Sequence, residues 1–285
     1  MLELSFNWNP SPELFKIGGF AIRYYSLMFI IAFVLGLQLM KKMYIADKIS
    51  LEHLDPLFMY VVIATIIGAR LGHVFFYDWA YFQNHLSEIL LPIRQEKGSE
   101  MLFGLVKNYT FTGFAGLASH GAAVGIILSL YYYSKRVIKK PLLFILDRVG
   151  VVVALAGFFI RIGNLMNSEI IGKATHSNFG IVFQKLGEDF PRHPTQIYEA
   201  FSYLIIFFIL WRIYWKTDKK QQQGYLFGMF FAILWAVRFF IEFLKEPQVD
   251  DRTTWLLNTG QWLSIPLVMI GIYFIYRSSA SKKES

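Results

Sequence analysis

Seven apolar runs, each about as long as a bilayer is thick, recur along the 285 residues of this chain. A transmembrane helix needs about 20 consecutive, mainly apolar residues to cross the hydrocarbon core of a membrane. Lipid cannot bond to backbone amides, so runs of this length must bond internally as helices. The sequence therefore predicts an all-α polytopic membrane protein built on a bundle of about seven transmembrane helices. The runs occupy residues 20–40, 56–77, 113–133, 142–160, 196–215, 224–244 and 261–276.

The composition agrees with a membrane protein, since 55% of the residues are hydrophobic and 17% are charged. Soluble domains carry about 25% charged residues. No part of the chain has the composition of a separate soluble domain, so we expect residues 1–285 to form a single integral membrane domain. There is no cysteine, which excludes disulfides, thiolate metal sites and a cysteine nucleophile. The first run has no basic-then-apolar lead of a cleavable signal peptide, so we expect it to remain as a helix.

In a soluble protein, a net charge of +8 would suggest binding to nucleic acid. Here the basic residues lie in short connections beside apolar runs, where they set the orientation of a membrane protein. They collect in the connections that follow the first, third, fifth and seventh runs. By the positive-inside rule these connections are cytoplasmic, so the N-terminus lies outside and the C-terminus inside. Residues 161–194 then form an extracytoplasmic module between the fourth and fifth helices. The basic residues of these four connections are Lys41, Lys42, Lys48, Lys135, Arg136, Lys139, Lys140, Lys216, Lys219, Lys220, Arg277, Lys282 and Lys283.

Polar residues crowd at the end of the fourth run, where the chain is still expected to be near lipid. Arg161, Asn164, Asn167 and Glu169 occur within a few positions. A guanidinium at that depth is costly unless it has a partner, an aqueous cavity or an anionic ligand. A snorkelling arginine at a helix end would explain Arg161 alone. The density of hydrogen-bonding groups around it favours a functional site.

Arg70, His73 and Tyr77 lie three and four residues apart in the second run and share one helix face. Lipid would penalise Arg70, so that face must turn toward the bundle interior. A polar network that only locks helix packing explains Arg70 as well as a binding site does, and for His73 packing is the better explanation.

The sixth run carries Arg238 and Glu242, four residues apart, which can pair along one helix face. Such a pair can be purely structural. Arg238 together with Arg161 would also place two cations near one membrane depth, as suits a phosphodiester. A lipid headgroup is the anion most available there.

His120 lies at the outer end of the third run, among Gly113, Gly116 and Gly121. A lone histidine is usually a packing residue, but an imidazole in this setting can also act as a base near neutral pH. Residues 192–199 make a polar entry to the fifth run. A proline in the first turn and nearby acid are ordinary features of a helix start, but they do not explain why Tyr198 clusters there with histidine and glutamine.

Taken together, these motifs resemble those of the bacterial phosphatidylglycerol–prolipoprotein diacylglyceryl transferases. The arginine–glycine–asparagine block of that family is similar to residues 160–172, its Arg-His-Pro block to residues 192–199, and its histidine–glycine motif to residues 119–121. Shorter similarities follow in the family's order at residues 25–28, 68–72, 238–243 and 260–264. Departures are Ser26 for a glycine, His73 for an aromatic residue, Lys245 for an arginine, and a longer region at 78–112.

The resemblance implies a transferase that moves the diacylglyceryl group of phosphatidylglycerol to the lipobox cysteine thiol of a prolipoprotein. A thioether forms and glycerol phosphate is released, which is the first step of bacterial lipoprotein maturation. The implied partners are phosphatidylglycerol, the prolipoprotein signal peptide with its lipobox cysteine, and the membrane. We expect no cofactor, metal or nucleic acid. The implied location is the bacterial cytoplasmic (inner) membrane, with the active site toward the outer leaflet.

The resemblance also implies roles for individual residues. His120, Arg161 and Arg238 are expected to be catalytic, the arginines stabilising the departing phosphodiester and His120 taking the thiol proton. Tyr25 and Glu242 are weaker alternatives as the base. Asn164, Glu169 and Glu242 are expected to orient the arginines. The expected substrate-binding residues are Arg161, Tyr25, Arg70, Asn164, Glu169, Tyr198 and Glu242.

Other functions would also bury arginines in a helical bundle. A transporter for an anionic phospholipid or phosphate predicts inverted repeats and interrupted helices, which the sequence does not display. A lipid-binding protein would need the same headgroup site but not His120. An intramembrane serine protease is a poor fit, because no Gly-x-Ser-x-Gly element is present.

Replacing Arg161 with alanine is expected to abolish transfer in a protein that still folds, because the charge on the departing phosphodiester would lose a stabilising cation. The measurement is the diacylglyceryl mass gained by a lipobox peptide. A folded and active variant would contradict the assigned role.

Overall fold

The computed structural model describes residues 4–17, 20–101, 105–111, 116–247 and 257–280. Within these residues, six helical segments are long and apolar enough to cross a membrane, which confirms a mostly helical, polytopic protein. Gly113, Lys282 and Lys283 lie outside the described residues. The spanning elements are α1 (Tyr24–Ala46), η1 with α2 (Leu51–His53, Leu54–Tyr77), α6 (Leu142–Asn167), α7 (Thr195–Lys216), α8 with η5 (Tyr225–Ile241, Glu242–Leu244) and α9 (Thr259–Ala280).

The third expected span is shorter than the sequence indicated. Its helix, α5 (Ser119–Tyr133), has 15 residues and continues into a five-residue π-helical turn, η2 (Ser134–Ile138). Together the two supply about the 20 residues that a span requires. The helix cannot begin earlier, because Gly116 has a φ of +73° and Ala118 is extended. The amide of Ala118 is bonded instead to the carbonyl of Ala69, at 2.9 Å.

The chain divides into two compact units. The large unit consists of Met1–Asp47 and Leu143–Ser285 and contains α1 and α6 to α9. The small unit, Lys48–Leu142, contains α2, α5, two short helices α3 (Trp79–Phe82) and α4 (Ser87–Leu90), and the hairpin of β4 (Ile93–Met101) and β5 (Val106–Phe111).

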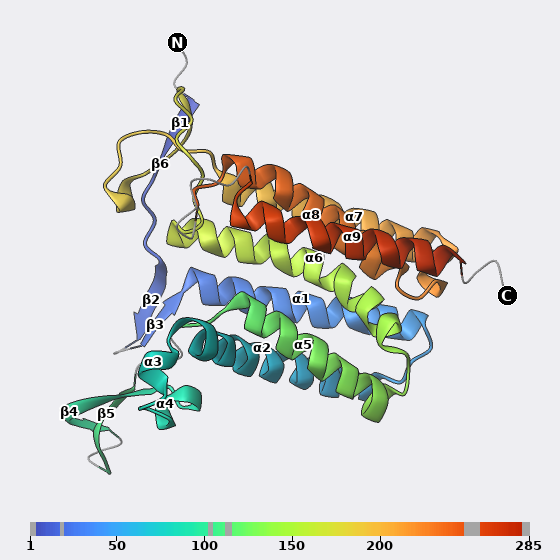
Figure 1. Ribbon diagram of the computed structural model, residues 1–285, viewed down its shortest axis with the longest axis horizontal. Helices are drawn as coiled ribbons and strands as arrows, with labels where there is room; N and C mark the ends of the chain where they lie inside the picture. Colours follow the sequence, from blue (N-terminus) through green and yellow to red (C-terminus); the bar gives the residue numbers. More distant parts are fainter. Residues whose placement is uncertain (1–3, 18–19, 102–104, 112–115, 248–256, 281–285) are drawn as a thin grey trace. The chain divides into compact units, whose positions relative to one another are not determined.

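In the small unit, α2 and α5 lie side by side and touch through glycines (Figure 1). A Cβ atom on Gly72 would come within 2.7 Å of Cα of Gly121, and one on Gly125 within 2.7 Å of the carbonyl oxygen of Ala64. Small residues four apart on each helix therefore let the two backbones meet. Because the helices are antiparallel neighbours in this contact, the end of α2 lies beside the start of α5.

In the large unit, a buried carboxylate joins α6 to α8. Asp147 accepts hydrogen bonds from the amides of Gly224 (2.8 Å) and Phe227 (2.9 Å), which are the unpaired donors at the start of α8. The adjacent Arg148 pairs with Asp47 after the end of α1, at 3.0 Å. These contacts hold α1, α6 and α8 together at the end of the unit where the basic connections lie.

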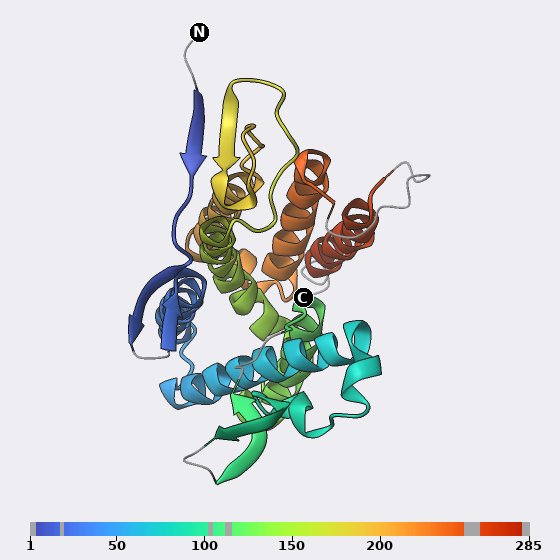
Figure 2. The same cartoon turned by 90° about the vertical axis from the view of Figure 1, so that its left-hand side faces the viewer.

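Short strands occur in the connections, although the sequence indicated no sheet. β1 (Leu4–Trp8) pairs in parallel with β6 (Phe179–Phe183), as Figure 2 shows, and β2 (Glu13–Ile17) pairs with β3 (Phe20–Arg23). The β1–β6 pair docks on the end of α6. Ile181 and Phe183 pack against Leu165, and the indole nitrogen of Trp8 donates to the Leu165 carbonyl at 2.9 Å.

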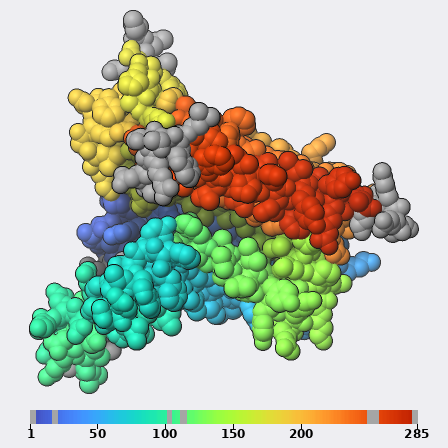
Figure 3. Space-filling view, viewed as in Figure 1, coloured from blue at the N-terminus to red at the C-terminus, as the bar shows by residue number. Residues whose placement is uncertain are grey.

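α9, drawn in red in Figure 3, exposes many large apolar side chains, as expected for a helix in lipid. The exposed side chains are Trp262, Leu263, Met269, Ile272, Tyr273 and Tyr276.

Replacing Gly121 with leucine is expected to force α2 and α5 apart, because its side chain would collide with the backbone of Gly72. Overpacking of this kind costs roughly 1–3 kcal/mol or more. The measurement is the free energy of unfolding in detergent, with SDS as the denaturant. Ala123→Leu, at an exposed position of the same helix, is the control. Equal stability of the two variants would contradict the close crossing.

Candidate functional site: a buried charge cluster

Arg161, near the end of α6, is paired with a carboxylate inside the large unit. Its Nε lies 2.7 Å from Oε2 of Glu199 on α7, and its NH1 donates to Oδ1 of Asn164 at 3.0 Å. Glu199 is fully buried and Arg161 is only 9% exposed. Burying two charges is costly unless each compensates the other. The guanidinium is therefore held within the protein, and it does not snorkel to water.

A chain of hydrogen bonds continues from Arg161 into the turn after α6. Asn164 donates to Oε2 of Glu169 at 3.2 Å, and Asn167 donates to Oε1 at 2.9 Å. The side-chain amide of Gln196 donates to the Glu169 backbone carbonyl at 2.7 Å. Asn164 thus contacts Arg161 directly, whereas the exposed Glu169 carboxylate reaches it through Asn164.

Lys245 completes the cluster, and the sequence reasoning did not include it in the site. Its Nζ lies 3.4 Å from Oε1 of Glu199 and 3.5 Å from Oε2 of Glu242, and the residue is only 1% exposed. Glu199 therefore bridges two cations, Arg161 and Lys245. A signal was available in the sequence: a lysine three residues beyond Glu242, at the end of an apolar run, needs a partner.

The module between α6 and α7 holds the backbone around Lys245. Gly172 and Lys245 form an antiparallel bridge, and the amide of Lys173 donates to the carbonyl of Leu244 at 2.8 Å. The amide of Glu246 donates in turn to the carbonyl of Ile171 at 3.0 Å. The segment after α8 is thus bonded to the segment after α6, which places the ammonium of Lys245 beside Glu199.

Arg192 fastens this module. Its Nε and NH2 both donate to the Glu188 carboxylate at 2.6 Å, and its NH1 donates to Glu246 at 3.0 Å and to the Gly172 carbonyl at 3.0 Å. The hydrogen bonds with Glu188 raise the pKa of the Arg192 guanidinium above its ordinary value. This arginine is therefore a fixed cation committed to the module's own structure.

Arg238, on α8, has no carboxylate within ion-pair distance among the residues that the structure describes. Its guanidinium lies 5.1 Å from the ring centroid of Trp235. The expected pair with Glu242 is wrong: Glu242 is bonded to Lys245. The physical reason is that α8 ends at Ile241 and the chain leaves η5 extended at Lys245, which brings the ammonium back to Glu242.

The buried charges of the cluster balance without Arg238. Arg161 and Lys245 are two cations, and Glu199 and Glu242 are two buried carboxylates. Arg238 is half-buried and adds a further positive charge. A half-buried arginine of this kind favours an anion with two or three oxygen acceptors.

The other predicted residues of the large unit lie at two places. Tyr25, in the first turn of α1, packs on α6, where a Cβ atom on Gly163 would be 2.8 Å from its Cδ2. Tyr25 is therefore next to the last turns of α6, which carry Arg161 and Asn164. Tyr198 faces a different partner, since its hydroxyl lies 3.4 Å from Nδ1 of His193.

In the small unit, Arg70 is engaged by backbone. Its NH2 donates to the carbonyl of Glu88 at 2.6 Å and its Nε to that of Ile89 at 2.9 Å. The guanidinium also lies 4.7 Å from the ring centroid of Phe82. These contacts hold α3 and α4 against α2. Of the two roles that the sequence left open for Arg70, packing and ligand binding, they support packing.

His120, also in the small unit, is the second residue of α5 and is exposed. Its Nε2 lies 3.4 Å from the hydroxyl of Tyr77. The ring of Tyr77 is stacked on that of His73, with 5.9 Å between centroids and 12° between planes. The structure thus brings His120 together with two residues of the α2 face that the sequence had singled out.

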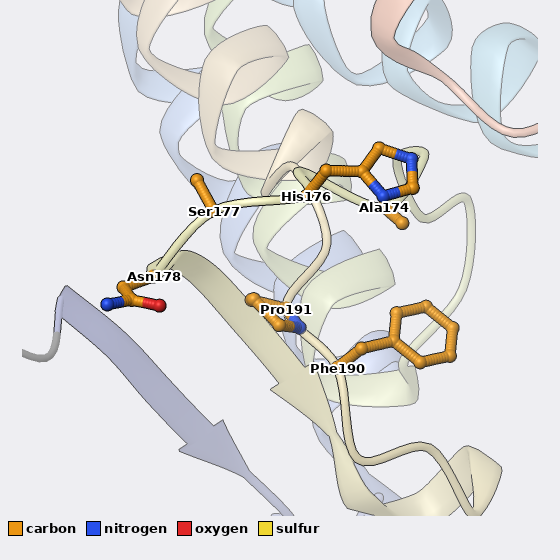
Figure 4. A pocket seen from close by; sticks show the side chains of 6 residues that line it. All are labelled: Ala174, His176, Ser177, Asn178, Phe190 and Pro191. Atoms are coloured by element: carbon orange, nitrogen blue, oxygen red, sulfur yellow. The ribbon is translucent and has the colours of Figure 1, made fainter.

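A shallow pocket of about 420 Å³ lies in the module of the large unit, and Figure 4 shows the side chains that line it. It contains no lysine, arginine or acidic residue and no predicted site residue, so its chemistry does not suit a phosphodiester. The lining residues are Ala174, His176, Ser177, Asn178, Phe190 and Pro191. Within the described residues, no three histidine or acidic side chains converge closely enough to hold a metal ion.

The fold and the cluster define a multi-pass membrane protein with a partly buried cationic site. The chain belongs to the prolipoprotein diacylglyceryl transferase family, whose model matches residues 12–277. It is 43% identical over 275 residues to the phosphatidylglycerol–prolipoprotein diacylglyceryl transferase of Bacteroides fragilis, covering 96% of each chain. The protein of the same name from Tolumonas auensis is 38% identical over 275 residues, covering 96% of this chain and 98% of the relative. That from Chloroherpeton thalassium is 38% identical over 271 residues, covering 95% and 93%.

Glu199→Ala is expected to destabilise the protein, because it leaves Arg161 without its carboxylate and Lys245 with one partner fewer. Removing one member of a buried pair costs roughly 3–5 kcal/mol. The free energy of unfolding in detergent measures the effect, and Asp218→Ala, at an exposed position of the same unit, is the control. If both variants unfold at the same denaturant concentration, Glu199 does not hold the cluster together.

Proposed function

We propose that this protein transfers the diacylglyceryl group of phosphatidylglycerol to the lipobox cysteine thiol of prolipoproteins, the first step of bacterial lipoprotein maturation. Its full-length membership of the family supports this activity. The single structural observation that carries the proposal is Arg238, a half-buried cation beside a charge cluster that is already balanced. The phosphodiester of phosphatidylglycerol supplies the anion that such a site lacks.

Arg161 and Arg238 have different roles in this proposal. Arg238 binds the phosphate: among the described residues no carboxylate lies within ion-pair distance of it, and Glu199, which its charge reaches from farther away, is already paired with Arg161 and Lys245. Arg161 is held rigidly by Glu199 and Asn164, and it stabilises the charge that grows on the phosphate oxygen as it leaves. A donor that is already oriented needs no rearrangement during the reaction, which is the usual source of electrostatic stabilisation in enzymes.

The bond changes follow from the chemistry of a thiol and a phosphodiester. The thiol sulfur forms a bond to the glyceryl carbon of the lipid as the bond from that carbon to the phosphate oxygen breaks. A thiolate is the stronger nucleophile, so a base must take the thiol proton, and His120 is assigned that role. Glycerol phosphate leaves with the electron pair of the broken bond. Because the thiol belongs to the substrate, a chain without cysteine can perform the reaction.

We also propose that the cluster faces the outer leaflet of the cytoplasmic (inner) membrane, with the N-terminus outside and the C-terminus inside. Tyr25, at the start of α1, packs beside the Arg161 turn, whereas Lys41 and Lys42 lie near the other end of the same helix. The cluster and the basic residues thus occupy opposite ends of the large unit, as the positive-inside rule requires. Residues 168–194, between α6 and α7, then form the extracytoplasmic module of a single membrane domain; the first seven residues of the range predicted from the sequence, 161–167, belong to α6.

The transfer itself is the test of this function. Purified protein in detergent is incubated with phosphatidylglycerol and a lipobox peptide that carries one cysteine, and the peptide mass is measured. We expect a diacylglyceryl mass gain on the cysteine peptide and none on a serine-substituted control. The alternative function is a transporter or binding protein for an anionic phospholipid. Folded protein that binds phosphatidylglycerol but adds no mass to the peptide would favour that alternative.

Arg238→Gln is expected to slow transfer by about 10- to 150-fold, because one charge-assisted hydrogen bond to phosphate contributes roughly 1.5–3 kcal/mol. The initial rate is measured as the lipid concentration rises in mixed micelles. Arg212→Gln, an exposed arginine on α7, should keep the wild-type rate. An Arg238→Gln variant that matches the wild type would contradict the assignment of the phosphate to Arg238.

A further inference from the structure

Tyr77 and His120 meet where α2 ends and α5 begins. The hydroxyl oxygen of Tyr77 lies 3.4 Å from Nε2 of His120, and the two rings meet edge to face, with 6.1 Å between their centroids. Tyr77 is 62% exposed, so its hydroxyl is not buried in a packing role. No residue that the structure describes is hydrogen-bonded to Nδ1 of His120, the other ring nitrogen.

The surrounding backbone holds both rings in place. The Ala118 amide is bonded to the Ala69 carbonyl, which anchors the start of α5 to α2. His73, one turn before Tyr77, stacks on the tyrosine ring. Gly116 lies so close to the His73 ring that any side chain there would collide with the imidazole. Among the described residues, the titratable group in contact with His120 is Tyr77, and His73 stacks on the other side of that contact against Tyr77.

The chemistry of imidazole gives this contact a consequence. A neutral imidazole carries its proton on one ring nitrogen and accepts a proton on the other, and the hydrogen bond of one nitrogen decides which is which. When Nε2–H donates to the Tyr77 oxygen, Nδ1 has the free lone pair. The same bond strengthens once Nδ1 has taken a proton, because the ring is then a cation and a better donor.

We propose that Tyr77 is a positioning residue for His120: its hydroxyl accepts the Nε2–H hydrogen bond, fixes the tautomer and ring orientation, and leaves Nδ1 to take the thiol proton. This inference rests on the proposed transferase function. Tyr77 does not touch the reacting atoms and acts through His120. A tyrosine that served only as an aromatic anchor at the membrane interface would be replaced by phenylalanine without effect.

The test compares Tyr77→Phe with the wild type in the peptide transfer assay between pH 5 and 9. Loss of the hydroxyl is expected to lower kcat by on the order of tenfold, with little change in KM for phosphatidylglycerol. The acid limb of the pH–rate profile should move to lower pH, because the protonated imidazole loses an acceptor. In a His120→Ala background the same change should have no further effect on the residual rate. Tyr276→Phe, at an exposed tyrosine of α9, is the matched control.

Three outcomes separate the possibilities. A slower Tyr77→Phe enzyme with a shifted acid limb and an unchanged unfolding temperature supports the inference. A Tyr77→Phe variant with wild-type kcat and pH profile overturns the inference and leaves the transferase function standing. No transfer by the wild type overturns the proposed function and, with it, the role of Tyr77.

Discussion

The fully buried carboxylate of Glu199 is the charge on which the site depends. It lies between the guanidinium of Arg161 and the ammonium of Lys245, on a helix that is expected to be surrounded by lipid. A cation cannot stay in such surroundings without compensation. Glu199 supplies it for Arg161, and Glu242 assists with Lys245. In the proposed function, Arg238 is the cation that attracts the phosphate.

The module between α6 and α7 has a structural role that follows from this arrangement. It bonds the chain after α6 to the chain after α8, through Gly172, Lys173 and the carbonyl of Leu244. Those bonds carry the backbone of Lys245 to the cluster, and Arg192 secures them through Glu188 and Glu246. The connection between α6 and α7, which lies outside the helices, therefore sets the position of the buried Lys245 ammonium.

The features that could be predicted from the sequence are those set by a local physical requirement. An apolar run long enough to cross a bilayer must be a helix, so the spanning helices were predictable to within a few residues. The exceptions were α5, where Gly116 delays the start of the helix, and α1 and α6, which continue six and seven residues beyond the ends predicted at residues 40 and 160. An arginine in such a run needs partners, which is why Arg161, Asn164 and Arg70 could be singled out.

Partner choice was less predictable, because it depends on segments distant in the chain. Glu242 was expected to pair with Arg238 but pairs with Lys245, because α8 ends at Ile241, between Arg238 and Glu242. Arg70 bonds to the carbonyls of Glu88 and Ile89, and no pattern in the sequence marks backbone acceptors. The parallel pairing of β1 with β6 joins two strands that are far apart in the chain, Leu4 lying opposite Phe179, and strands of five residues carry little signal in the sequence.

In the proposed function, Arg238 binds a phosphate, while Glu199 and Glu242 are paired with the other two cations, Arg161 and Lys245. The most direct measurement is the thermal unfolding of the purified protein in detergent as glycerol 1-phosphate, the released headgroup, is added. Binding to the folded state raises the unfolding temperature. We expect a rise for the wild type and for Arg212→Gln, and none for Arg238→Gln. An equal rise in Arg238→Gln would show that the phosphate is bound elsewhere and would contradict the account.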